Sequence, residues 1–110
     1  MELLTFDDYV TIQRALTDGD EYDVVQYGDI HNGNCRYQQG GQVYNGVMVR
    51  NSVCFIPEDI SVSENDRVTI VLSNARKMQG IVESYKNVRQ PLTHERLTRI
   101  ILKQVKDIVQ

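Results

Sequence analysis

The residues from 45 to 85 constrain the fold most strongly, because they form a succession of short apolar segments separated by turn-forming residues. Four segments, at 47–49, 53–57, 67–72 and 78–85, have the length and the Val, Ile and Phe content of β-strands. Between them lie turn-like sequences rich in Asn, Asp and Ser. Short strands at this spacing predict a small β-barrel or sandwich.

The residues on either side extend this pattern. A first strand is expected at 9–16, with Val10 and Ile12 on one face, and another at 34–38. The dipeptide Asn45-Gly46 predicts a hairpin at 43–47 with a type I′ turn, and Asn32-Gly33 predicts a second tight turn. Gly80, inside a strand-like segment, indicates a bulge or a close backbone approach.

Two patterns compete near the C-terminus. Helical spacing relates Leu97, Ile100, Ile101, Val105 and Ile108, which favours a short helix within 93–108. The β-branched segment 99–103 is also short enough to be a closing strand, but periodicity alone narrowly favours the helix.

The length of 110 residues predicts one domain, which should bury roughly two-thirds of the surface that its unfolded chain exposes. We expect a single barrel over 1–110, with an N-terminal extension at 1–8 and a flexible loop at 38–46. The N-terminus lacks the pattern of a signal peptide, and no apolar run reaches the roughly 18 residues that span a bilayer. The two cysteines, Cys35 and Cys54, are expected to be free thiols.

Charge is distributed unevenly along the chain. Residues 1–30 hold eight acidic side chains and one basic one, whereas residues 75–110 hold eight basic and three acidic ones. Either each end has a solvated, charged face, or identical copies meet head to tail, with the acidic end of one facing the basic end of the next.

Catalytic and metal-binding patterns are not found. Asp7 and Asp8 are neighbours in an extended segment, so their side chains should point to opposite faces. The soft metal ligands have spacings that match no zinc pattern, and neither a nucleophile elbow nor a phosphate loop occurs. Those ligands are His31, Cys35, Cys54 and His94. The sequence therefore predicts a protein that is not an enzyme and has no cofactor.

Nucleic-acid binding is an alternative. A stripe of basic residues would contact phosphates, and six tyrosines would offer stacking platforms. The pI of 5.3 disfavours this function, because dedicated nucleic-acid binders are usually basic. The stripe would consist of Lys86, Arg89, Arg96, Arg99, Lys103 and Lys106.

The order of the segments resembles that of the head-closure, or stopper, proteins at the neck of long-tailed bacteriophages. The resemblance covers about residues 8–105 and is carried mainly by the strand that ends at Ile56-Pro57, the strand that begins at Asp66-Arg67 and the strand 80–85. The acidic segment 18–29 and the helix-compatible C-terminus depart from the family pattern.

The resemblance implies a small β-barrel that forms a ring beneath the portal and its adaptor, retains packaged double-stranded DNA and docks the tail. The protein would then belong to the virion, at the head–tail junction, and to the host cytoplasm during assembly, without a membrane partner. A loop between the second and third strands serves as the channel plug in that family. Here the plug would be 38–46, with its tip at Gln38, Gln39, Gly40, Gly41 and Gln42.

The charge split suggests further roles in such a ring. The channel-facing acidic side chains, which would repel passing DNA, would be Asp18, Asp20, Glu21 and Asp23. The basic residues that would meet a neighbouring subunit or the adaptor are Arg96, Arg99 and Lys103. We predict a mainly β, single-domain structural protein of the phage neck, and the family pattern favours a strand at the C-terminus. The alternatives are a free-standing SH3-like interaction barrel and a nucleic-acid-binding barrel.

Overall fold

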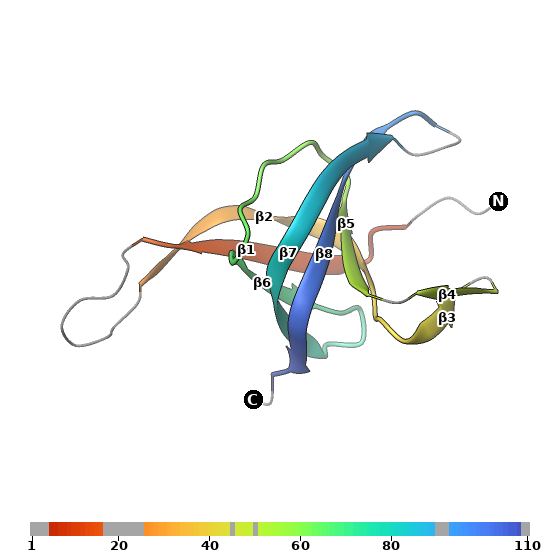
Figure 1. The fold of residues 1–110 in the computed structure, drawn as a ribbon, viewed down its shortest axis with the longest axis horizontal. Helices are drawn as coiled ribbons and strands as arrows, with labels where there is room; N and C mark the ends of the chain where they lie inside the picture. The colour runs from red at the N-terminus through yellow and green to blue at the C-terminus, as the bar shows by residue number, and fades with distance from the viewer. Residues whose placement is uncertain (1–4, 17–25, 45, 50, 90–92, 109–110) are drawn as a thin grey trace.

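The computed structural model describes residues 5–16, 26–44, 46–49, 51–89 and 93–108, and for 42–44 and 47–49 only the backbone. The described residues form eight strands, and none of them is helical (Figure 1). Six strands belong to the barrel and two form a separate hairpin. The strands are β1 (Asp8–Ala15), β2 (Tyr27–Gln38), β3 (Gln42–Tyr44), β4 (Val47–Val49), β5 (Ser52–Ile56), β6 (Arg67–Val71), β7 (Lys77–Arg89) and β8 (Arg96–Asp107). The predicted small β-barrel is thereby confirmed.

The barrel consists of two antiparallel three-stranded units. One is β1-β2-β5 and the other is β6-β7-β8. Pairing of β1 with β6 and of β5 with β8 closes them into a barrel in the order β1-β2-β5-β8-β7-β6. Closure removes most of the open sheet edges that would otherwise invite aggregation.

The core lies inside this barrel and follows the period of two along each strand. Val10 and Ile12 are fully buried, as predicted, and so are Val68 and Ile70 of the neighbouring β6. The interior is thus filled by side chains. The other members of the buried cluster are Cys35, Cys54, Ile56, Val62, Val82, Ile100 and Leu102.

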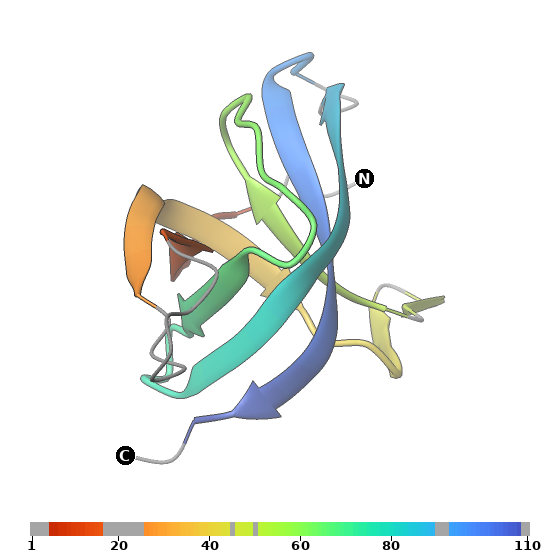
Figure 2. The ribbon, with the colours of Figure 1, turned by 60° about the vertical axis from the view of Figure 1, so that its left-hand side comes forward.

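The two units are joined by a crossover, residues 57–66, that leads from β5 to β6 (Figure 2). Val62 is 5% exposed and packs into the core cluster, and Ile60 packs against it. Asn65, at φ 75°, lies in the turn before β6, and backbone hydrogen bonds join Asn65 and Asp66 to Val82. The crossover therefore supplies side chains to the core besides connecting the units.

Gly80 lies at a bulge, as the sequence predicts. The β7–β8 pairing passes from Gln79↔Lys106 to Ile81↔Lys103, so Gln104 and Val105 oppose the single residue Gly80. A Cβ atom on Gly80 would come within 2.9 Å of the Val105 side chain. The absence of a side chain is what allows the two strands to approach here.

The turn predicted at Asn32-Gly33 is wrong, because β2 continues through both residues. Asn32 pairs with Thr11, whose hydroxyl donates to the Asn32 side chain at 2.9 Å, and Gly33 pairs with Val10. Pairing with the buried strand β1 overrides the local turn preference.

The short helix considered near the C-terminus is wrong as well, because 96–107 is a strand. Ile100 and Leu102 point into the barrel, while Leu97, on the other face, is only 3% exposed. A strand buried on both faces carries a nearly continuous apolar run, which imitates helical spacing. No helix long and apolar enough to cross a membrane occurs in the described ranges.

The predicted hairpin at 43–47 is confirmed. Tyr44 of β3 pairs with Val47 of β4 across a two-residue turn, in which Gly46 has φ 80°. The hairpin lies beside the barrel, between β2 and β5 in the chain (Figure 1). Gly46 lies at its distal end.

The residues predicted to form the tip of the plug, 38–42, lie at the base of this hairpin. Gln38 ends β2, Gln42 begins β3, and Gln39, Gly40 and Gly41 form the base of the hairpin. The Ser52 hydroxyl accepts a hydrogen bond from Gly40 N at 3.0 Å, which ties this base to β5.

Candidate interaction surface

Of the two neighbouring carboxylates at the start of β1, Asp8 has a structural role. Asp8 accepts hydrogen bonds from Tyr37 N at 2.9 Å and from Ser73 N at 3.0 Å, so it joins β1 to β2 and to the turn that follows β6. Asp7 is exposed. The two do not share a site, as their adjacency predicts.

The four soft ligands are dispersed over the barrel. His31 lies 4.0 Å from Glu58, and His94 is in the turn before β8 with φ 59°. Cys35 and Cys54 are free and buried in the core. Within the described ranges, no three His, Cys, Asp or Glu side chains are grouped so that they could hold a metal ion.

The two cysteines interact with each other. A hydrogen bond with Cys35, reinforced by burial, raises the pKa of the Cys54 thiol well above its ordinary value. Cys54 is therefore a protonated core residue at neutral pH and is not a reactive nucleophile.

The best-developed polar surface lies on the extension of β7 and β8 that we call the arm, residues 86–89 and 96–99 (Figure 1). In the arm, β7 pairs with β8 alone, because β6 pairs with β7 only from Lys77 to Ile81. The β5–β8 pairing ends at Thr98. The arm thus leaves one strand edge without a partner in the described structure, and its charged side chains protect that edge against indiscriminate pairing.

Two pairs of like charges face each other across the arm. Lys86 is opposite Arg99, and Arg89 is opposite Arg96. All four side chains are exposed. Like charges at directly opposed positions destabilise a sheet, so this arrangement is costly for an isolated protein.

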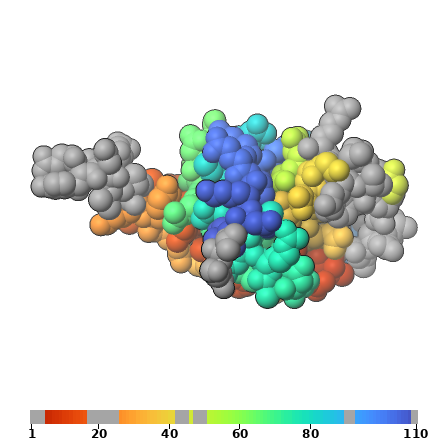
Figure 3. All heavy atoms as spheres, turned by 90° about the horizontal axis from the view of Figure 1, so that it is seen from below, coloured from red at the N-terminus to blue at the C-terminus, as the bar shows by residue number. Residues whose placement is uncertain are grey.

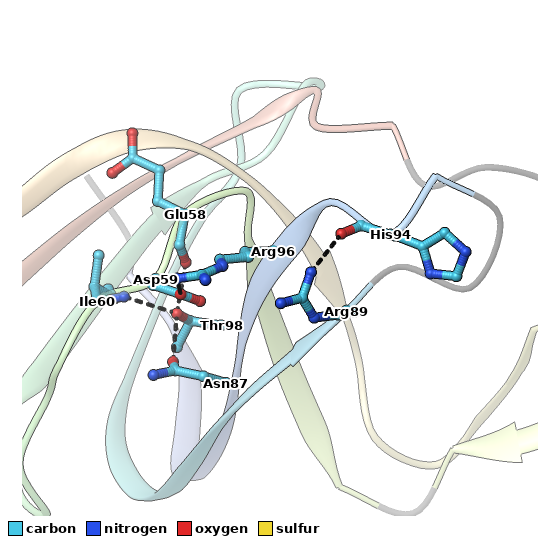
Figure 4. A network of polar contacts seen from close by, with 8 residues as sticks. All are labelled: Glu58, Asp59, Ile60, Asn87, Arg89, His94, Arg96 and Thr98. Carbon is cyan, nitrogen blue, oxygen red and sulfur yellow. Dashed lines mark hydrogen bonds and ion pairs between the residues drawn. The ribbon is translucent and has the colours of Figure 1, made fainter.

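A buried polar network anchors the arm to the crossover (Figure 4). The Thr98 hydroxyl is completely buried, accepts from Ile60 N at 3.0 Å and donates to Glu58 O at 2.6 Å. Asn87 Oδ1 lies 3.0 Å from the same hydroxyl oxygen. The root of the arm is therefore held firmly against the barrel.

The three predicted interface residues do not form one patch. Arg96 and Arg99 lie on opposite faces of β8, because their positions differ by an odd number. Arg96 forms an ion pair with Asp59 at 2.9 Å, and Lys103 lies 3.8 Å from Glu64. Of the three, only Arg99 has no ion pair among the described residues.

Arg89 and Arg96 also line a small cavity of about 250 Å³ with Asp59, Asn87 and Val88. Arg89 donates to the backbone oxygen of His94 at 3.3 Å, an acceptor without formal charge (Figure 4). The arm therefore offers three guanidinium groups, of which one is neutralised within the described structure.

The acidic residues predicted to face a channel, Asp18, Asp20, Glu21 and Asp23, lie outside the described residues. Sequence reasoning did not find the intramolecular partners Asp59 and Glu64, since each is more than 35 residues away from its basic partner. It also did not pair Lys86 with Arg99, a contact that depends on the β7–β8 register.

Comparisons with known proteins identify no relative of this chain, so a functional assignment must rest on its own sequence and structure. No family profile, no curated protein and no solved structure matches this sequence.

Proposed function

We propose that this chain is a structural protein of a phage neck, which forms a ring below the portal and adaptor, retains packaged DNA and provides the docking surface for the tail. The resemblance in segment order suggests this function, and two structural features support it. The barrel is closed and filled by side chains, and a hairpin is inserted between its second and third strands. That is the place where the resemblance expects the plug.

The observation that carries the proposal is the pair of like charges formed by Lys86 and Arg99. Their mutual repulsion is relieved when an acidic surface lies across the arm. The acidic residues of the segment 1–30 in a second copy would provide such a surface, and so would an acidic adaptor or tail protein. Contacts between different faces of identical copies close into rings when the rotation allows it.

The hairpin β3–β4 is the proposed plug. Its base is fixed by the hydrogen bond between Gly40 and Ser52, whereas its turn, which includes Gly46, lies at the far end from the base. A short hairpin can move as a unit about such a base, so the plug would retain double-stranded DNA with the turn rather than with the Gln-rich segment. In this arrangement the acidic residues of 18–23 would repel the DNA that passes through the ring.

The first test is quantitative mass spectrometry on density-purified phage particles from the source culture. A constant, low ratio of this chain to the major capsid protein, as a single ring requires, supports the proposal. Absence from intact particles refutes it and favours a free-standing interaction barrel.

The second test examines the arm. Purified Lys86→Glu/Arg99→Glu protein should fail to complete DNA-filled, tailless heads, whereas Lys77→Glu, on the same strand within the barrel, should still complete them. Equal completion by both variants would exclude the arm as the assembly surface. Binding of short oligonucleotides with a steep salt dependence, without binding to heads, would favour the nucleic-acid-binding alternative.

A further inference from the structure

A second polar surface lies on the opposite part of the β7–β8 pair, near the bulge. A cavity of about 250 Å³ opens where β6, β7 and β8 meet, and Tyr27 and Asn65 complete its rim. Its other side chains come from Arg67, Gln79, Ile81, Gln104 and Lys106. No carboxylate is among them.

The bulge creates this cavity. Because Gln104 and Val105 oppose only Gly80, Val105 packs against the core while Gln104, at φ 55°, lines the cavity. Gly80 contributes no side chain that would fill the space. The backbone irregularity therefore produces a polar recess on the outer face of the barrel.

Arg67 is held in place on one side of the recess. Its guanidinium group stacks on the Tyr27 ring, 3.7 Å from the ring centroid. Gln13 Oε1 accepts from its Nε at 3.0 Å and from its Nη2 at 2.6 Å. The partner is neutral, so the positive charge is kept, and three of the five guanidinium N–H groups are left for a ligand.

The charge of Arg67 contrasts with that of its neighbours. Lys103 has Glu64 at 3.8 Å, Arg14 has Asp66 at 3.0 Å, and Arg76 has Asp107 at 2.8 Å. Neither Arg67 nor Lys106 has an acidic partner within the described ranges. Two cations without carboxylates thus line one recess, together with the amide groups of Gln79 and Gln104.

We propose that this recess binds a phosphate group. A dianion balances Arg67 and Lys106 together, whereas a single carboxylate would balance only one of them. A planar guanidinium that is fixed by stacking is well suited to a phosphate, because its remaining N–H groups are already oriented. The volume admits the phosphate and a small attached group. The source is either a free phosphate or phosphomonoester, which supplies one dianion, or a nucleic-acid backbone, which would have to supply two adjacent monoanionic phosphodiesters.

The test is a titration of the ¹⁵N-labelled full chain with inorganic phosphate at constant ionic strength and at about pH 8, where inorganic phosphate is mainly a dianion. We expect saturable shifts of the Arg67 Nε resonance and of the amides of Gln79 and Gln104, with a Kd of about 1–10 mM. Lys106→Gln should weaken binding about tenfold, and Lys77→Gln, at a lysine of β7 that does not line the recess, should leave it unchanged. Arg67→Gln should weaken binding at least as much as Lys106→Gln.

Several outcomes would overturn the proposal. Linear shifts without saturation, unchanged binding by Lys106→Gln, or equal shifts with acetate would each exclude a phosphate site. Because Lys106 is exposed, its variant remains informative even if Arg67→Gln fails to fold. A short single-stranded oligonucleotide that competes for the same resonances assigns the site to a nucleic-acid backbone, and one that does not compete assigns it to small phosphates.

Discussion

The buried carboxylate of Asp66 allows a quantitative prediction about the stability of the barrel. It is 3% exposed and accepts three hydrogen bonds, from Ser63 N at 2.7 Å and from Arg14 Nε and Nη2 at 3.0 Å each. It thus ties the crossover to β1. The paired guanidinium has its own pKa raised by the hydrogen bond and the charge of Asp66.

The cost of Asp66→Asn follows from these contacts. The Ser63 N–H bond contributes about 2 kcal/mol, because its acceptor is a buried carboxylate and hydrogen bonds to charged groups are stronger than those between neutral groups. Arg14 is 44% exposed, so solvent weakens its pair with Asp66 and its share is about 1 kcal/mol. The asparagine variant should therefore lose about 3 kcal/mol, whereas Arg14→Met should lose only about 1 kcal/mol.

Urea denaturation followed by circular dichroism measures both values. With a slope of about 1.5 kcal/mol per molar urea, Asp66→Asn should lower the midpoint by about 2 M. A double variant should cost about 1 kcal/mol less than the sum of the single changes, because the shared ion pair can be lost only once. A loss below 1 kcal/mol for Asp66→Asn, or a larger loss for Arg14→Met, would refute the reasoning.

Three further predictions concern the bulge, the core thiols and the arm. Gly80→Val should destabilise the fold by about 2 kcal/mol or more through overpacking against Val105, as measured by urea denaturation, whereas a neutral effect would contradict the close approach. Because the folded pKa of Cys54 is raised, its contribution to stability is complete below the unfolded pKa of about 8.5 and is lost as pH rises above it. Between about pH 8.5 and 9.5 the free energy of unfolding of the wild type should therefore fall by about 1 kcal/mol more than that of Cys54→Val, as measured by urea denaturation at the two pH values. Lys86→Glu should stabilise the isolated protein by about 0.5 kcal/mol, because it replaces a like-charge pair with Arg99 by an opposite-charge pair, and thermal unfolding that shows a loss would contradict the cross-strand contact.

Much of the fold could be predicted because the informative signals are local. The alternation of Val10 and Ile12 fixes the inner face of β1, and that of Val68 and Ile70 does the same for β6. Asn45-Gly46 and Gly80 indicate a turn and a bulge through backbone requirements that few other residues meet. Each of these signals is contained within a few consecutive residues.

The incorrect predictions concern segments whose secondary structure is determined by tertiary contacts. Asn32-Gly33 has a turn preference, but the segment is extended because β1 pairs with it over its full length. Leu97 and Ile100 lie on opposite faces of β8, and no local pattern tells that both of these side chains are buried. The apolar spacing of this segment fits a helix and a two-sided strand equally well.

The candidate surfaces were less predictable than the fold. Once β8 is taken as a strand, the period of two separates Arg96 from Arg99, so that part of the predicted patch could have been corrected from the sequence. The recess could not have been found in this way. Tyr27, Arg67 and Lys106 are about 40 residues apart along the chain, and only the closure of the barrel and the β7–β8 bulge bring them together.

Ion pairs with carboxylates distinguish the cationic side chains that stabilise the fold from those that are available to bind partners. Arg14 and Arg76 have carboxylates in reach and join strands or turns of the barrel. The arm and the recess instead contain cations without carboxylates in the described structure, at separate parts of the same strand pair. If the proposed assembly role of the arm and the proposed phosphate site are independent, Lys86→Glu/Arg99→Glu should abolish head completion and preserve phosphate binding, while Lys106→Gln should do the reverse. Loss of both functions in either variant would show that the two surfaces bind one extended partner, and a nucleic-acid backbone that crosses β7 and β8 would then be the simplest such partner.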